Sequence, residues 1–327
     1  MKNEVKGEEF KDGFRKQLSR DVVLRLTRRS AWRSVLAILH DVAVIAAAVA
    51  IAVHFWPHPL VVLLSVIVIG TRQHALFVIA HDAAHYLLFG NRGLNDLAGR
   101  LCATVQGLSM CTYRVIHRLH HNNLYGELDP DTALHGGYPR GRGYLVRKLL
   151  KDVCGLTAWK TYAYFLGGAP ALNTSTNVAL RPLDDTSSKL KADAVSDRNL
   201  VIVFHVLMLG AFAWSGYLLE YLVLWILPLV TVVQAILRLR AIAEHGATTD
   251  FSSPLTAART NLAPAWLEWL IFPHGVNYHI EHHLYASVPH HNLRELHREM
   301  VKGGLLEGAE VVPFGATLGK IFANRAT

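Results

Sequence analysis

The stretch Leu200–Leu219 limits most strongly how this chain can fold, because it contains no Asp, Glu, Lys or Arg over 20 residues. A helix of about 20 apolar residues crosses the hydrocarbon core of a bilayer. Tyr221–Leu237 is a second such run, and two more begin near Val35 and Leu60. A water-soluble bundle of buried helices is the alternative, and the charge-free stretch argues against it. We therefore expect four membrane-spanning helices, at 35–56, 60–80, 200–219 and 221–241.

The composition supports a membrane protein and excludes several other classes. Hydrophobic residues make up 51% of the chain and charged residues 18%, against about 25% charged in an ordinary soluble domain. The net charge is +8, but no basic recognition helix or aromatic RNA-binding strand accompanies it, so we expect no nucleic acid partner. Three cysteines are too few for a disulfide scaffold or for the four thiolates of a usual iron–sulfur cluster.

The basic residues predict the orientation of the spans. Lys and Arg are abundant before the first span and between the second and third, and such segments stay on the cytosolic side. We expect a cytosolic N-terminal arm, 1–34, and one domain, 35–327. In that domain the spans form two hairpins beneath a cytosolic helical cap made of 81–199 and 242–327. The fold class is therefore all-α and integral to the membrane. Within the cap, Tyr144–Leu156 has the spacing of an amphipathic helix and 181–197 is expected to be a polar linker.

Histidine is unusually frequent, with 19 residues, and eight of them form three tight groups. Residues three or four apart share one face of a helix, so each group presents two or three imidazoles to one point. Imidazole is a ligand for iron, copper, zinc and nickel. A single such pair has little meaning, but three in one chain indicate metal binding. The groups are His81 and His85; His117, His120 and His121; and His279, His282 and His283.

The three groups are expected to lie at one depth. His81 is about 31 Å along a helix from Leu60, which is roughly the thickness of the hydrocarbon core. The second group belongs to the basic cytosolic segment, and the third follows an even number of crossings. His245 is about 36 Å along a helix from Tyr221 and reaches the same boundary. It is therefore a ninth candidate ligand.

These motifs resemble those of the membrane fatty acid desaturases with three histidine boxes. The resemblance rests on HDAAH at 81–85, HRLHH at 117–121, EHG at 244–246 and NYHIEHHL at 277–284, and it extends from about Thr71 to Leu296. It implies a non-haem centre of two iron ions (Fe2+/Fe3+) in the cytosolic cap and O2-dependent formation of a double bond in a fatty acyl chain. No catalytic side chain beyond the metal centre is expected, and no substrate-binding residue is identified. The implied iron ligands are His81, His85, His117, His120, His121, His245, His279, His282 and His283.

Two differences from the motifs of other desaturases indicate how the protein receives electrons. The third box begins with His279 rather than the glutamine of front-end desaturases fused to cytochrome b5, and no His-Pro-Gly-Gly haem signature occurs. Electrons are therefore expected from a separate donor such as ferredoxin, rubredoxin or cytochrome b5. The other expected partners are the lipid bilayer and a fatty acyl substrate. We expect a multi-pass protein of the bacterial inner membrane with its active site on the cytosolic side.

Other polar residues near the boxes are candidates for supporting roles. Arg72 and Arg238 lie near the cytosolic ends of the second and fourth spans, where they are expected to pair with Glu244, bind a substrate headgroup or reach lipid phosphates. The sequence Asp129-Pro-Asp131 is expected to form a turn, and His135 is given no metal role. The candidates to orient ligand imidazoles are Asp82, Glu244, His274 and Glu281.

Three other functions compete with a desaturase. A hydroxylase of the same family would add one oxygen to a small hydrophobic molecule instead of removing two hydrogens. An intramembrane zinc protease is suggested by the likeness of HDAAH to H-E-x-x-H, but Asp82 replaces the glutamate and the other boxes would be superfluous. A metal transporter would hold its site near the bilayer midplane, whereas these histidines are expected at the rim.

Overall fold

Four segments long and apolar enough to cross a membrane dominate the structure, a computed structural model that describes residues 18–126, 129–167, 187–251 and 253–324. The number of spans predicted from the sequence is confirmed, and their ends lie within a few residues of the expected places except at the start of the third. The spans are α3 (Ala31–His54), α4 (Pro59–Ala84), α10 (Ser188–Ser215) and a segmented fourth span, Leu218–His245.

The third span begins well before the expected position at Leu200. Ser187 caps α10 by accepting a hydrogen bond from the backbone N–H of Leu190 at 3.3 Å. The carboxylate of Asp197 then accepts the backbone N–H of Cys111 at 2.8 Å and pairs with Arg100 at 2.6 Å. These contacts anchor the polar first turns of α10 to α5 (Arg92–Thr104) and α6 (Met110–Asn123). The prediction of a linker over 181–197 is therefore wrong from residue 188 onward, and 181–186 lie outside the described residues.

The fourth span is interrupted near its middle. It consists of α11 (Leu218–Tyr221), a π-helical turn (Leu222–Ile226), α12 (Leu227–Val230) and α13 (Val232–His245). Pro228 has no backbone N–H to donate, so a regular α-helical ladder cannot continue through it. Thr231 then leaves helical geometry, with φ −122° and ψ −79°. As a result, α13 has a direction of its own and carries His245 toward the other histidines.

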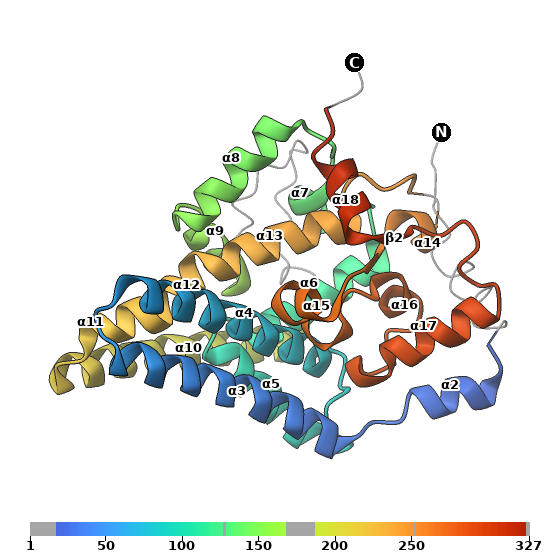
Figure 1. The fold of residues 1–327 in the computed structure, drawn as a ribbon. Coiled ribbons are helices and arrows are strands. Elements are labelled where there is room, and N and C mark those ends of the chain that lie inside the picture. The colour runs from blue at the N-terminus through green and yellow to red at the C-terminus, as the bar shows by residue number, and fades with distance from the viewer. Residues whose placement is uncertain (1–17, 127–128, 168–186, 252, 325–327) are drawn as a thin grey trace.

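Helix α4 is the centre of the membrane-embedded part, and α10 lies at its edge. Of the most apolar window of each helix, 72% is buried inside the protein for α4 but only 6% for α10. Helix α3 packs along α4, as Figure 1 shows, whereas α10 packs against α5, α6 and α11. Gly70 permits a close approach of α4 to α13, because a Cβ atom there would lie 2.6 Å from the Cβ of Val232.

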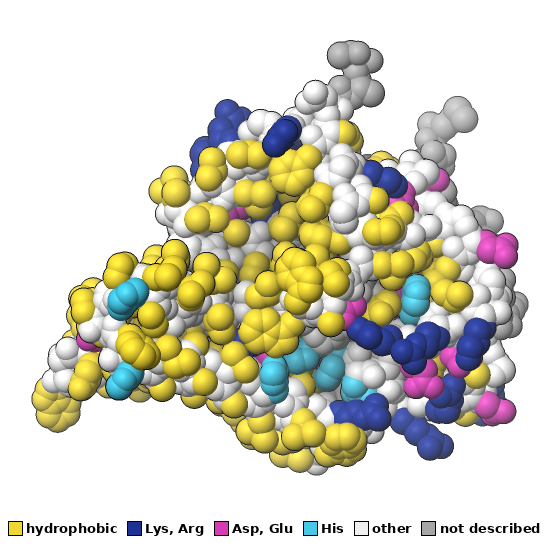
Figure 2. Space-filling model, in the orientation of Figure 1, with side chains coloured by type: hydrophobic (Ala, Val, Ile, Leu, Met, Phe, Trp, Pro, Cys, Tyr) yellow, Lys and Arg dark blue, Asp and Glu magenta, His cyan; other side chains and the backbone are white. Residues whose placement is uncertain are grey.

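The outer faces of these helices are apolar. Leu36, Leu39 and Leu207 are more than half exposed, and Trp214 is 93% exposed. In Figure 2 hydrophobic side chains cover the part of the molecule formed by α3, α4 and α11. Exposed apolar surface of this extent is the expected boundary with lipid.

Shorter elements surround the ends of α4 and α13. Two very short strands, β1 and β2, pair in parallel, with Thr260 opposite Val311. The expected amphipathic helix at Tyr144–Leu156 is present as α8. The elements are α2 (Arg20–Leu26), α7 (Thr132–His135), α8 (Arg142–Val153), α9 (Ala158–Phe165), α14 (Pro254–Ala257), β1 (Thr260–Leu262), α15 (Ala265–Ile271), η2 (Pro273–Gly275), α16 (His279–Leu284), η3 (His290–Asn292), α17 (Leu293–Lys302), β2 (Val311–Pro313) and α18 (Phe314–Ile321).

Candidate metal centre

The nine histidines singled out in the sequence come together from four elements. They lie at the end of α4, along α6, on the last residue of α13 and on α16. All are buried except His85, which is partly exposed. They form two groups whose ligand atoms lie within 4.8 Å of one another: His81, His85, His117, His121 and His282, here the five-histidine group, and His120, His245, His279 and His283, here the four-histidine group.

The nitrogen-to-nitrogen distances fit bound cations. In the five-histidine group the Nε2 atom of His282 lies 3.0 Å from that of His81 and 2.9 Å from that of His121. In the four-histidine group the Nε2 atom of His245 lies 2.7 Å from that of His279 and 3.2 Å from that of His120. Two nitrogens bound at right angles to one ion at about 2.1 Å would be about 3.0 Å apart. Imidazoles so crowded cannot all satisfy each other by hydrogen bonds, so a metal ion in each group fits the donor set.

The electrostatics of the groups keep the imidazoles neutral, which is the form that binds metal. Burial, together with the charge of neighbouring histidines, holds the pKa values of His117, His121 and His282 well below their usual range. The same causes act on the pKa of His279. For His85, burial and the neighbouring His81 lower the pKa to about 3.

His120 is an exception, because a carboxylate supports it from behind. Burial alone would lower the pKa of His120, but the charge and hydrogen bond of Asp129 raise it. The Nδ1 atom of His120 lies 2.9 Å from Asp129, so its Nε2 atom is left facing the four-histidine group. Asp129 is itself held by the backbone N–H of Tyr125 at 2.9 Å. The sequence predicted only a turn here, although an aspartate shortly after a histidine box is a signal for such a partner.

Of the four candidates to orient the ligands, Asp82 and Glu244 lie nearest to ligand imidazoles. The carboxylate of Asp82 lies 3.5 Å from Nδ1 of His81 and 2.7 Å from Nδ1 of His290. Glu244 lies 3.9 Å from Nε2 of His279 and pairs with Arg240.

Glu281 and His274 have different surroundings. Glu281 is fully buried and contacts Thr260 and His297, each at 2.5 Å, so it ties α16 to β1 and α17. His274 lies 2.7 Å from Asp41 on α3. The contacts of His290 and His297 were not predicted from the sequence, because Asp82 lies 208 positions from His290 and Glu281 is on a different helix from His297.

The prediction that Arg72 or Arg238 pairs with Glu244 is wrong. Arg72 pairs with Asp41 at 3.2 Å and lies over the ring of Trp269. Arg238 donates to Asp152 on α8. Glu244 instead binds Arg240, which precedes it by four residues and therefore shares its face of α13.

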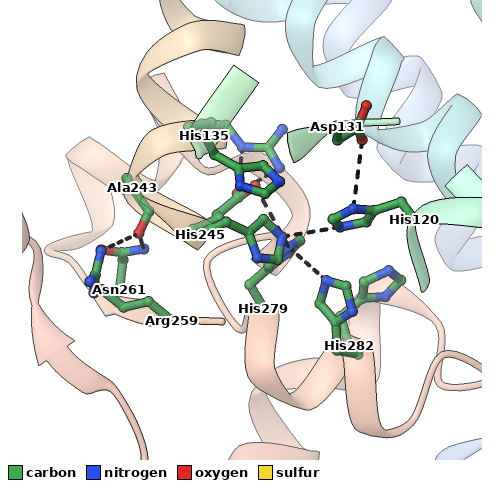
Figure 3. Close-up of polar contacts among 12 residues, drawn as sticks. His120, Asp131, His135, Ala243, His245, Arg259, Asn261, His279 and His282 are labelled. Carbon is green, nitrogen blue, oxygen red and sulfur yellow. Dashed lines mark hydrogen bonds and ion pairs between the residues drawn. The ribbon is translucent and has the colours of Figure 1, made fainter. Parts of the chain in front are cut away.

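Arg259 holds the end of α13 that carries His245. Its guanidinium is fully buried and donates to the backbone carbonyls of Ala243 and Gly246, each at 3.0 Å. These carbonyls end the helix and have no partner within it. Asn261 donates to the same Ala243 carbonyl at 3.1 Å, as Figure 3 shows. Because this arginine lies 14 residues from His245 and outside every box, no sequence signal identified it.

A cavity of about 150 Å³ adjoins both histidine groups and is called here the α9 cavity. His135 reaches it from α7. Its ring is 1% exposed, and neither ring nitrogen has a hydrogen-bond partner among the described residues. Figure 3 shows His135 beside His245. The metal ligands His81, His117, His120, His245 and His279 also face this cavity.

The comparisons with known proteins agree with this architecture. The chain is 28% identical to the dihydrorhizobitoxine desaturase of Bradyrhizobium elkanii over 84% of its own length and 77% of the relative's. It is 26% identical to the sn-1 acyl-lipid omega-3 desaturase (ferredoxin) of Nostoc sp., over 68% of this chain and 63% of that one. It is also 26% identical to the sn-1 oleoyl-lipid 12-desaturase of Synechocystis sp., over 70% and 65%. It thus spans just under two thirds of the last two.

The family model described as "Fatty acid desaturase" matches residues 57–311. This range holds both histidine groups and three of the four spans. The chain therefore belongs to the fatty acid desaturase family.

Proposed function

We propose that this protein is an O2-dependent desaturase that introduces a double bond into a fatty acyl chain at a histidine-ligated di-iron centre. The observation that carries the proposal is the division of nine imidazoles into groups of five and four beside one cavity. Bound there, two iron ions would supply the reduction of O2 that an unactivated C–H bond requires. Two hydrogens leave the substrate, and two electrons from a separate donor and two protons complete the reduction of O2 to two molecules of water.

The protein's own residues hold and shield this centre. Buried, neutral imidazoles present their nitrogens to the ions, and Asp129 fixes the ring of His120. Arg259 fixes the end of α13 beneath His245. A substrate bound in the α9 cavity would have a C–H bond next to both histidine groups, and Phe77 and Phe165 would form an apolar part of the wall around it. No other catalytic side chain is part of the proposal.

We further propose the arrangement of the chain in the membrane. The arm 1–34 and the histidine-bearing cap lie in the cytosol, and the single domain 35–327 crosses the bilayer as two hairpins in a bacterial inner membrane. The concentration of basic residues on α2 and α17 supports this orientation. The same surface suits an acidic electron donor, and the name of one relative mentions ferredoxin.

Metal analysis and product analysis test the proposal together. The protein is expressed in a host whose lipids and small acids are profiled, and the iron content of the purified protein is measured. We expect two irons per chain and a product lighter by two hydrogens. A product heavier by one oxygen would instead indicate the hydroxylase, and one zinc with peptide cleavage would indicate the protease.

Replacement of one ligand sharpens the test. His120→Ala is expected to insert into the membrane and to lose all product, because the four-histidine group keeps only three imidazoles. His54→Ala is the matched control, because His54 is exposed at the opposite end of α3 and lies in neither group. Full activity in His120→Ala would refute the ligand assignment.

A further inference from the structure

We propose that the substrate is a free acid whose carboxylate binds Lys160 in the α9 cavity. This inference rests on the proposed function, because it adds the chemical form in which the substrate is bound. It follows from the shape of the cavity, the charges in its wall and its volume.

One face of α9 forms the wall of the cavity away from the histidines. Thr157, Lys160, Thr161 and Tyr164 all line it, at the spacing of residues that share a helix face. Tyr164 and Asp131 both line the cavity, and Asp131 lies 3.9 Å from Nδ1 of His120. Lys160 precedes Tyr164 by four residues, or about 6 Å along the helix axis. A substrate held at Lys160 would therefore lie in the same cavity that the metal ligands line.

Lys160 is the cation in this wall that lacks a carboxylate partner among the described residues. Arg238 is neutralised by Asp152, and Arg240 by Glu244 at 2.7 Å. Lys160 has only a ring contact, with its ammonium nitrogen 5.4 Å from the centre of Trp159. A partly buried ammonium group without a counter-charge favours an anionic ligand.

The start of α9 adds to the positive potential at the same place. The helix begins after Thr157, whose side chain makes no capping hydrogen bond and instead donates to Asp152. The uncapped N–H groups of a first turn carry partial positive charge and attract an anion. Buried His135 also lines the cavity, with no hydrogen bond to either ring nitrogen among the described residues and with Nε2 3.9 Å from Asp129, and it provides polar atoms for the ligand at the metal end.

The volume of the cavity limits the length of the substrate segment that it holds. About 150 Å³ is available, and an engineered protein cavity of about that size binds one benzene molecule. Apolar side chains of Phe77, Leu134, Phe165 and Leu237 line the rest of the wall. The bound part of the substrate is therefore a few carbons long. An acyl thioester or a lipid ester would place an uncharged carbonyl at Lys160, whereas a free acid places its carboxylate there.

Ligand binding without O2 tests this inference apart from the reaction. Iron-loaded protein in lipid nanodiscs is titrated with hexanoate, hexan-1-ol and methyl hexanoate by calorimetry under anaerobic conditions. We expect hexanoate to bind at least tenfold more tightly than the two uncharged probes, since hydrogen bonds to charged groups are among the stronger ones. Equal binding of the three probes, or no binding of hexanoate to iron-loaded protein, would overturn the inference and leave the di-iron assignment intact.

Variants of Lys160 locate the binding. Lys160→Met is expected to weaken hexanoate binding at least tenfold without changing hexan-1-ol binding, and Lys160→Arg is expected to restore most of it. Lys151→Met is the matched control, because Lys151 is exposed on α8 and does not line the cavity. The inference fails if Lys160→Met binds hexanoate like the unmodified protein, or if Lys151→Met weakens binding equally. A failed proposed function is recognised separately, by the absence of bound iron or by intact hexanoate binding with no oxidised product.

Discussion

Both ring nitrogens of His120 have partners, and these lie on opposite sides of the ring. Nδ1 contacts Asp129, while Nε2 lies 3.2 Å from Nε2 of His245. A carboxylate behind a ligand imidazole sets which nitrogen keeps its proton and makes the other a better donor to metal. The residue that tunes this ligand is therefore Asp129, which lies in a turn outside every histidine box.

Asp129→Asn tests that role. The amide keeps the size of the side chain but loses the charge, so we expect the affinity for iron to fall about 10- to 100-fold, the range found for such partners. Iron retained against a graded series of chelator concentrations measures the change. Asp193→Asn is the control, since Asp193 is exposed on α10. Unchanged iron retention in Asp129→Asn would show that His120 does not need its carboxylate.

The sequence predicted those parts of the candidate site that depend on residue spacing within one helix. Spacings of three and four residues predicted that eight histidines share helix faces. The length of the fourth span predicted that His245 lies at the same depth in the membrane as these eight. The supporting residues were not predictable in this way. Arg259 reaches the end of α13 from outside the boxes, and His290 contacts Asp82 across 208 positions of sequence. Such contacts depend on tertiary packing, which no single segment encodes.

At the scale of elements, the crossing of α4 and α13 sets the distance between the two histidine groups. α4 carries His81 and α13 carries His245, and the two helices touch at Gly70 and Val232. The membrane spans themselves were predictable because their apolar runs are long. The early start of α10 was not, because its first turns are polar and are held by Asp197. The break at Pro228 was also missed, since the hydrophobic pattern continues through it.

Gly70→Ala tests the crossing. The new Cβ atom would meet Val232 at 2.6 Å, so the helices must separate, at a cost of about 1–3 kcal/mol typical of overpacking. We expect a lower unfolding temperature and reduced iron content. Gly210→Ala in α10 is the matched control, because nothing lies within 4 Å of the Cβ position there. Equal behaviour of the two variants would mean that the close approach does not position the site.

At the scale of the whole molecule, the surface is divided between an apolar part and a basic part. The apolar faces of α3, α4 and α11 lie on one side in Figure 2, and Lys and Arg, interspersed with Asp and Glu, gather over α2 and α17 on the other. Arg28, Arg29 and Arg298 are exposed there. Complementary charge accelerates the encounter of partners and does so less at high salt.

Reversing this charge tests where the electron donor binds. Arg29→Glu combined with Arg298→Glu is expected to slow turnover with an acidic ferredoxin about tenfold at low salt, while turnover driven by dithionite stays the same. Arg142→Glu combined with Arg147→Glu, on exposed positions of α8, is the control. If both double variants slow turnover equally, the electron donor does not bind specifically at the surface formed by α2 and α17.

The sparse packing of α10 has a consequence for handling the protein. Its first turns are held to α5 and α6 through Asp197, and His205 and Phe212 contact Thr104 and Tyr221, but only 6% of its most apolar window is buried inside the protein. In a bilayer the rest of that window would be surrounded by lipid acyl chains rather than by protein. Detergent would replace these acyl chains first around α10, which carries none of the nine histidines. A purified preparation would then keep its iron although the lipid contacts of α10 are already lost.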